Sequence, residues 1–183
     1  MNKLTLVLAA SGALALAAPV TPAFATIETA EARSAAAEAA TAARNDMVDV
    51  FGDKQLDPGE YVWNDKAAAS GAPRFVISLS DQLAYLYRGD QLVAVTTISS
   101  GTASNPTPTG IFPILGKKKV HFSNKYDNAP MPFMQRLDKW GIALHAGHNP
   151  GYPASHGCIR LPKKFAAKLF NVTKVGSEVM IAA

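Results

Sequence analysis

Fourteen consecutive residues concentrate the reactive side chains of the chain. The segment HAGHNPGYPASHGC runs from His145 to Cys158 and holds three of the four histidines and the only cysteine. A cysteine is a useful nucleophile only as the thiolate, and a neighbouring imidazole that accepts its proton provides that form. Gly157 allows a tight backbone approach, so that main-chain N–H groups can face a developing oxyanion. The segment thus predicts a thiol nucleophile that is paired with a histidine base.

Two other interpretations of the segment stay open on the residues alone. One is a zinc site that takes three nitrogens and one sulfur from His145, His148, His156 and Cys158. The glycines and prolines between these ligands argue against a rigid metal cage. The other is a packed, inert thiol with surface histidines, which the dense clustering of rare residue types disfavours.

The elements that must position these residues begin near Arg74. Short β-type runs predict strands at residues 75–79, 83–87, 92–98, 111–115, 141–145 and 178–181. His145 ends one of these runs, where a rigid strand can aim a general base at the following loop. Pro162 suits the first turn of a helix that runs to about Phe170. Many short strands with one or two short helices predict a mainly β sandwich or barrel.

The N-terminal residues 1–25 have the pattern of a signal peptide. A basic start is followed by an apolar run over residues 4–18 and by the small-x-small cleavage pattern AFA at residues 23–25. The apolar run is too short for a comfortable membrane span, so we expect no stable span after cleavage. We therefore expect a secreted chain in which a single thiol has no internal partner.

Residues 26–73 predict an α-helical segment and a linker that precede the catalytic region. Helix propensity is strong over residues 29–50, and Gly52 is placed to end the helix. The apolar face of this helix is mostly alanine, so weak packing or a spacer role is expected. Residues 53–73 predict a linker with one short extended piece at residues 60–63. The predicted third region, residues 74–183, contains all the chemistry.

Composition excludes several classes of protein. One cysteine and four histidines exclude a disulfide framework and a Cys-rich zinc module, and no glycine-rich phosphate loop occurs. Residues 26–73 carry four Lys/Arg against nine acids, a net charge of −5, whereas residues 74–183 carry thirteen against five, a net charge of +8. A basic exported domain favours an anionic partner such as a carboxylate-rich wall polymer, and export disfavours nucleic acid.

The residues around the cysteine also resemble a known family. The run Ser155-His156-Gly157-Cys158-Ile159-Arg160 resembles the SHGC signature of the YkuD-type L,D-transpeptidase catalytic domain. Residues 77–87 are similar to the first hairpin of that domain, residues 107–112 to its T-P-x-G-x-F element, and residues 141–145 to the strand with its histidine. The resemblance covers about residues 74–183.

This resemblance implies a secreted cysteine acyltransferase of mostly β fold that needs no metal or cofactor and acts on peptidoglycan stem peptides. By analogy, Cys158 attacks the carbonyl between the L-centre of a diamino acid and the next D-residue, and a neighbouring stem peptide supplies the accepting amine. The implied supporting roles are a base at His145, an orienting carbonyl at Ala146, oxyanion donors at Gly157 and Cys158, site shaping by His156 and loop support by Ser155.

Substrate contacts and alternatives complete the expectations. Arg160 has a planar fork that matches a carboxylate, and Tyr152 and Trp140 are candidates to line the cleft. His121 is expected outside the cluster and His148 in a solvated loop. We expect a periplasmic enzyme of cell-wall crosslinking, with roles in wall biogenesis and cell shape. An L,D-carboxypeptidase or wall hydrolase with the same residues, and a non-catalytic wall-binding domain with or without zinc, are the alternatives.

Overall fold

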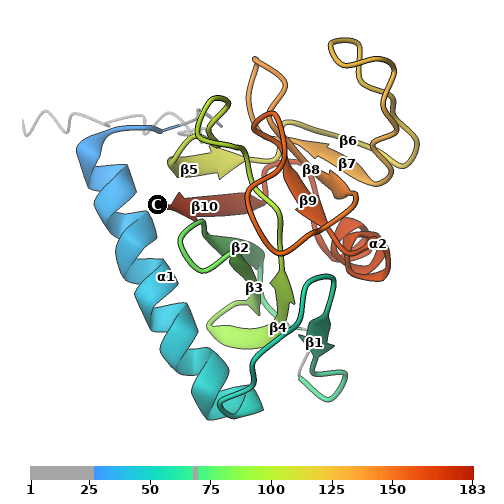
Figure 1. The fold of residues 1–183 in the computed structure, drawn as a ribbon. Helices are drawn as coiled ribbons and strands as arrows, with labels where there is room; N and C mark the ends of the chain where they lie inside the picture. Colours follow the sequence, from blue (N-terminus) through green and yellow to red (C-terminus); the bar gives the residue numbers. More distant parts are fainter. Residues whose placement is uncertain (1–26, 68–69) are drawn as a thin grey trace, which may run out of the picture.

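The computed structural model describes residues 27–67 and 70–183, which form two β-sheets and two helices (Figure 1). The larger sheet has the strand order β1-β4-β3-β2-β10-β5. Its strands are β1 (Tyr61–Trp63), β2 (Pro73–Ser78), β3 (Leu83–Arg88), β4 (Gln91–Thr97), β5 (Gly110–Pro113) and β10 (Glu178–Ala182). The smaller sheet, in the order β6-β7-β8-β9, consists of β6 (Gly116–Lys118), β7 (Met134–Arg136), β8 (Ala143–Ala146) and β9 (Ile159–Leu161). The predicted mainly β class is confirmed.

The larger sheet is built from a local hairpin series and one long-range strand. β2, β3 and β4 pair antiparallel in chain order, as the alternating sequence predicts. The C-terminal strand β10 enters between β2, which it pairs in parallel, and β5, which it pairs antiparallel. The last residues of the chain therefore lie in the interior of the sheet rather than at its edge.

The main hydrophobic core joins both sheets and the second helix, α2 (Lys163–Val172). Phe75 and Ile77 of β2 contribute to it, while Val76 between them faces the opposite side of the sheet, as the two-residue period of a strand requires. From the smaller sheet, β8 and β9 contribute Leu144 and Ile159. Because these side chains are fully buried, packing in the core holds in place the two strands that position the reactive residues.

Helix α1 (Ala30–Phe51) covers the other face of the larger sheet (Figure 1). The Thr29 hydroxyl caps its first turn by accepting the Ala32 N–H at 3.2 Å, and Gly52 ends it as predicted. Its alanine face packs more closely than expected, since Ala36 and Ala43 are fully buried in one cluster with Tyr85 of the sheet. The small alanine side chains let the helix backbone lie close to the sheet, and the large side chains of Tyr85 and Tyr87 fill the space between helix and sheet.

Of the predictions for the N-terminal third, one lies outside the described residues and one lies within them. The predicted signal peptide, residues 1–25, lies outside the described residues. Within residues 27–67 and 70–183, neither helix combines the length and apolar character that a membrane span requires. The predicted extended piece at residues 60–63 is present as β1, which pairs with β4.

Candidate active site

Parallel pairing of β8 with β9 brings the predicted base and nucleophile to one edge of the smaller sheet. In this register His145 lies opposite Arg160, and Leu144 lies opposite Ile159. Cys158 immediately precedes β9 and therefore faces the start of β8. The twelve residues of the loop 147–158 are closed by this strand pairing, which only the folded sheet provides.

His145 is buried and held by its own strand. Its Nδ1 lies 2.9 Å from the carbonyl oxygen of Ala146, which accepts the Nδ1 proton and leaves Nε2 as the free lone pair. Burial lowers the pKa of His145, and the positive charge of Arg160 acts in the same direction, whereas the Ala146 carbonyl raises it. The imidazole is therefore neutral at pH 7 and able to accept a proton.

Cys158 is half-buried, and two backbone groups contact its sulfur. The thiol donates to the carbonyl of Gly141 at 3.6 Å. Burial raises the pKa of Cys158, a hydrogen bond from the Ala143 N–H opposes that rise, and the charge of Asp138 adds to it. Both shifts favour an uncharged thiol–imidazole pair in the free protein.

The loop before the nucleophile is stabilised by Ser155. Its buried hydroxyl accepts the Gly157 N–H at 3.1 Å and donates to the carbonyl of Cys158. Gly157 has a φ of +106°, and a Cβ there would lie 2.7 Å from a methyl group of Ile142. The two expected oxyanion donors are the N–H groups of Gly157 and Cys158. The Gly157 N–H already donates to Ser155, whereas the Cys158 N–H has no acceptor among the described residues.

The T-P-x-G-x-F element supports this loop from behind. The Thr107 hydroxyl donates to the carbonyl of Gly157 at 2.8 Å and accepts the N–H of Gly101 at 2.9 Å. Gly101 and Gly157 lie back to back, since a Cβ on Gly101 would come within 2.8 Å of the Gly157 Cα. The element therefore fixes the loop before Cys158 rather than contacting the thiol or the imidazole.

Replacing Thr107 by valine tests this support. Thr107→Val keeps the side-chain volume but leaves a buried carbonyl and a buried N–H without their partner, so the free energy of unfolding should fall by about 1 to 3 kcal/mol. Urea denaturation measures the change, with Thr109→Val as the control, because Thr109 has no side-chain hydrogen bond within the described part of the chain. Equal stability of the two variants would contradict the assignment.

The thiol and the imidazole open into a cleft with a volume of about 1220 Å³. One wall is the loop 119–133 between β6 and β7, which the sequence did not predict as part of the site. His156 stacks on Tyr126 of this loop, with ring centroids 4.3 Å apart. His121, which lies outside the segment 145–158 and was expected to be a surface or structural residue, also lines the cleft. A single sequence gave no signal for this contact because the loop has no regular period.

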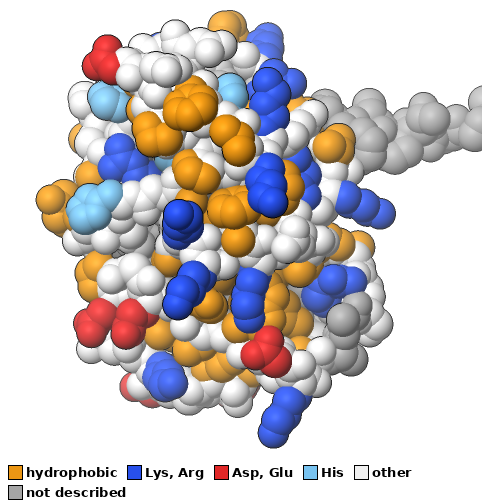
Figure 2. Space-filling view, turned by 90° about the vertical axis from the view of Figure 1, so that its right-hand side faces the viewer, with side chains coloured by type: hydrophobic (Ala, Val, Ile, Leu, Met, Phe, Trp, Pro, Cys, Tyr) orange, Lys and Arg blue, Asp and Glu red, His pale blue; other side chains and the backbone are white. Residues whose placement is uncertain are grey.

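The cleft is strongly cationic. Six basic residues line it and no acidic one does: Lys117, Lys118, Lys125, Arg136, Arg160 and Lys163. Figure 2 views the molecule from the side on which β6, β7 and α2 lie, and Lys and Arg side chains spread over this face among hydrophobic ones. Arg160 has no carboxylate within 4 Å in the part of the chain that the structure describes, so its guanidinium is free for an anionic ligand.

The remaining predicted residues divide between the cleft and the surface. Trp140 and His148 lie at the cleft, both exposed. Tyr152 does not line it; its side chain is 61% exposed and its carbonyl accepts a hydrogen bond from the Ser99 hydroxyl. Its expected role in binding substrate therefore loses support. Among the described residues no three His, Cys, Asp or Glu side chains gather as metal ligands, so the zinc alternative lacks the necessary geometry.

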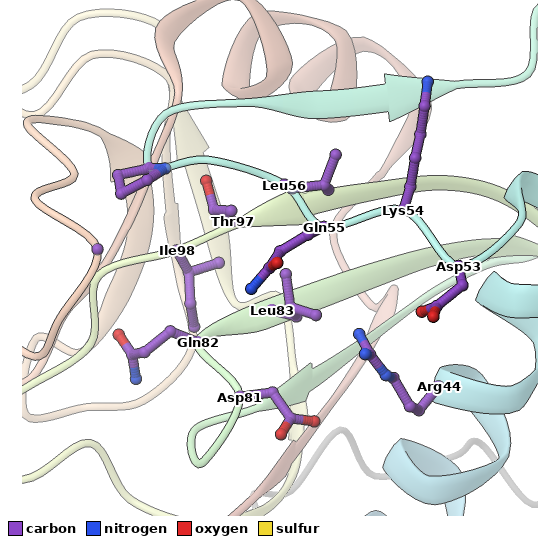
Figure 3. Close-up of a pocket in the computed structure, with 12 residues that line it drawn as sticks. Arg44, Asp53, Lys54, Gln55, Leu56, Asp81, Gln82, Leu83, Thr97 and Ile98 are labelled. Atoms are coloured by element: carbon purple, nitrogen blue, oxygen red, sulfur yellow. The ribbon is translucent and has the colours of Figure 1, made fainter.

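A second cavity, of about 560 Å³, lies between α1, residues 53–58 and the turn that joins β2 to β3 (Figure 3). Its polar side chains come from Arg44, Asp53, Lys54, Gln55, Asp81, Gln82 and Thr97. It is lined by neither a thiol nor an imidazole, whereas the cleft at Cys158 has both.

Comparison with known proteins agrees with this geometry. The model of the L,D-transpeptidase catalytic domain, YkuD, matches residues 72–181. The chain belongs to the L,D-transpeptidase family. The matched range contains the complete cleft and both strands that carry its reactive residues.

Several relatives of this L,D-transpeptidase domain are known. A Bacillus licheniformis protein that carries the name L,D-transpeptidase YkuD is 30% identical over 114 residues, which are 59% of this chain and 64% of that protein. Two solved structures share the fold: an L,D-transpeptidase from Mycobacterium smegmatis (TM-score 0.57, 20% identity, 61% of this chain and 59% of that one) and one from Stackebrandtia nassauensis (TM-score 0.57, 21% identity, 74% and 64%). The matches span less than two thirds of each relative's length.

Proposed function

We propose that this protein is a cysteine-dependent L,D-transpeptidase that acts on peptidoglycan stem peptides in cell-wall crosslinking or remodelling. The observation that carries the proposal is the β8–β9 pairing, which places the oriented imidazole of His145 and the thiol of Cys158 in one cationic cleft. The family supports acyl transfer in general, and the two side chains supply the groups that acyl transfer requires.

The reaction follows from these groups. The Cys158 sulfur attacks the carbonyl between the L-centre of the diamino acid and the following D-residue while His145 Nε2 takes the thiol proton. The Cys158 N–H faces the developing oxyanion. The C–N bond then breaks, the imidazolium returns the proton to the leaving amine, and a thioester remains on Cys158. An amine of a second stem peptide then attacks the thioester carbonyl and gives a proton to His145. The C–S bond breaks as the new amide forms, and the imidazolium passes that proton to the sulfur, which restores the thiol.

The charge of the cleft fits the substrate class. Stem peptides carry free carboxylates, and six Lys/Arg side chains without an acidic neighbour in the cleft attract them. Arg160 lies opposite His145 on the neighbouring strand, next to the reacting groups. Its planar guanidinium is suited to hold a carboxylate in two parallel hydrogen bonds.

Replacing Arg160 by glutamine should weaken substrate binding. Arg160→Gln removes a charge-assisted contact, so KM for a tetrapeptide donor should rise about tenfold or more. Steady-state kinetics measure the change, and Arg33→Gln, on the exposed face of α1, is the control for loss of one arginine. An unchanged KM in Arg160→Gln would remove this residue from the substrate site.

The product of a tetrapeptide muropeptide distinguishes transfer from hydrolysis. The protein is incubated with this donor, and mass spectrometry is used to detect a dimer crosslinked between diamino acids or a tripeptide that has lost the D-residue. Dimer supports the transpeptidase, whereas tripeptide alone supports the L,D-carboxypeptidase alternative. The control is protein alkylated at its single thiol. An unchanged donor with the folded, unmodified protein would favour the wall-binding alternative.

Location and domain organisation belong to the same proposal. The signal-peptide pattern of residues 1–25 and the wall-directed chemistry of the family support a periplasmic enzyme. We place the catalytic domain at residues 74–183, close to the matched range, and residues 26–73 in a preceding helix and connecting segment. None of the proposed steps requires a cofactor or a metal ion.

A further inference from the structure

One buried carboxylate organises the turn that joins β7 to β8. Asp138 Oδ1 accepts three backbone N–H groups, from Trp140 at 2.9 Å and from Gly141 and Ile142 at 2.8 Å each. The residue is only 6% exposed. The Leu137 N–H closes the turn by donating to the Ile142 carbonyl at 2.8 Å. A single acceptor for three successive amides fixes the path of the backbone across this turn.

The same turn forms the wall behind the nucleophile. The Gly141 carbonyl accepts the Cys158 thiol, and the Ala143 N–H, at the start of β8, donates to the sulfur. The Ile142 methyl group closes the space beside Gly157. Among the described residues, both groups that hydrogen-bond the sulfur therefore belong to the turn or to the residue directly after it.

We propose that Asp138 is a positioning residue for Cys158: its carboxylate shapes the turn that presents the Gly141 carbonyl and the Ala143 N–H to the sulfur. The proposal rests on the proposed role of Cys158 as the nucleophile. It goes beyond the cysteine–histidine pair, since Asp138 touches neither the thiol nor the imidazole by a hydrogen bond. Its action on the sulfur is exerted through the backbone and through its charge.

The charge of Asp138 gives its proposed positioning role a measurable effect on the pKa of Cys158, which a purely structural turn would not have. The charged and titratable groups around the sulfur come from five elements: Asp138 from the turn, His145 from β8, Arg160 from β9, and His121 and His156 from the two loops of the cleft. The negative charge of Asp138 raises the pKa of Cys158, whereas the positive charge of Arg160 lowers it. Removing the charge while keeping the acceptor should therefore make the thiolate easier to form.

Two substitutions separate shape from charge. Asp138→Asn keeps an Oδ1 acceptor for the three N–H groups and removes the charge, so the pH profile of iodoacetamide alkylation at Cys158 should move to lower pH in a folded protein. Asp138→Ala also removes the acceptor, so kcat should fall by about a hundredfold, with KM changed much less, because the thiol loses its position. Asp90→Asn, in the exposed turn after β3, is the control and should alter neither measurement.

The alkylation readout is independent of the proposed function. The chain has one cysteine, so the mass of the alkylated protein reports Cys158 alone, whether or not any peptidoglycan substrate turns over. The proposal is overturned if Asp138→Asn alkylates with the wild-type pH profile, or if folded Asp138→Ala keeps the wild-type kcat. Failure of Asp138→Asn to fold would also overturn it, in favour of a structural role.

Discussion

Cys158→Ala should reduce transpeptidation of a tetrapeptide donor by at least about a thousandfold, because no other group replaces the nucleophile. The sulfur is the only thiol of the chain and opens into the cationic cleft. The side chain is half-buried and small, so its truncation should change the free energy of unfolding by less than about 1.5 kcal/mol. Donor consumption, followed by mass spectrometry, measures the loss.

Two further measurements make this prediction specific. Cys158→Ser keeps the shape of the side chain but has a hydroxyl of much higher pKa, so it should be almost as inactive as the alanine variant. Calorimetric titration with the tetrapeptide should give a dissociation constant within about threefold of the wild-type value, since the cationic lining is intact. Donor turnover by Cys158→Ala at the wild-type rate would exclude the thioester mechanism.

His145→Gln should lower kcat/KM by about a hundredfold to ten thousandfold, the usual contribution of a positioned general base. Glutamine fills much of the imidazole's space but accepts no proton at neutral pH. The wild-type pH profile should also have a limb that this variant lacks. Because burial holds the pKa of His145 below its ordinary value, the base is neutral at pH 7 and is lost only as pH falls through that lowered pKa.

The pH dependence of kcat/KM between pH 4 and pH 9 measures both effects. His148→Gln is the matched control, since His148 lies at the same cleft but is exposed and has no hydrogen bond to the Ala146 carbonyl. It should keep the wild-type profile. An acid limb that survives in His145→Gln would assign the titration to another group of the cleft and contradict the proposed base.

The pH prediction for His145 depends on an uncharged pair in the free protein. The thiol has a raised pKa and the imidazole a lowered one, and burial is the first cause of each shift. A neutral thiol is a weaker target for oxidants than a thiolate, so the raised pKa of Cys158 should slow its oxidation in the free protein.

The local sequence was sufficient to predict the strands of the hairpin series and the helix near the C-terminus. The alternating runs at residues 75–79 and 83–87 became β2 and β3 because their apolar residues face two different cores. The pattern also predicted the ends of α1, where Thr29 and Gly52 satisfy backbone groups within a few residues. These features depend on neighbours in the chain, which a sequence displays directly.

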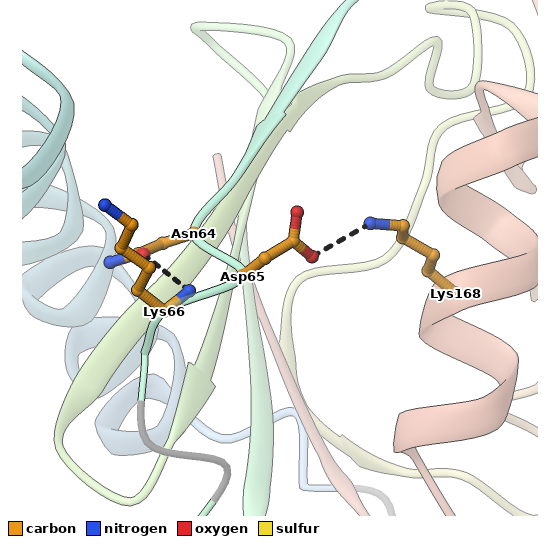
Figure 4. Close-up of polar contacts among 4 residues, drawn as sticks. All are labelled: Asn64, Asp65, Lys66 and Lys168. Atoms are coloured by element: carbon orange, nitrogen blue, oxygen red, sulfur yellow. Dashed lines mark hydrogen bonds and ion pairs between the residues drawn. The ribbon is translucent and has the colours of Figure 1, made fainter.

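Segments without a period were predicted less well. β6, β7 and β9 have three residues each, too few for a periodic signal, and exist because they pair with each other or with β8. Residues 53–73 were expected to be a linker with one short extended piece at residues 60–63; that piece is β1, but nothing in the sequence indicated that it pairs with β4 of the larger sheet. Figure 4 shows Asp65 of the same segment paired with Lys168 of α2, at 3.4 Å. Such contacts join residues about a hundred positions apart, and no local pattern records them.

The same division holds for the site. The residue types and spacing between His145 and Cys158 determined the chemistry, because a thiol and an imidazole are rare enough to be informative in one sequence. The tertiary structure alone decided the surroundings: the parallel register of β8 and β9, the wall that contains His121 and Tyr126, and the turn held by Asp138. Reactivity belongs to a side chain and is visible in the sequence. The position and burial of a side chain, and the shift of its pKa from the ordinary value, are set by which distant segments pack together, so they arise only in the folded protein.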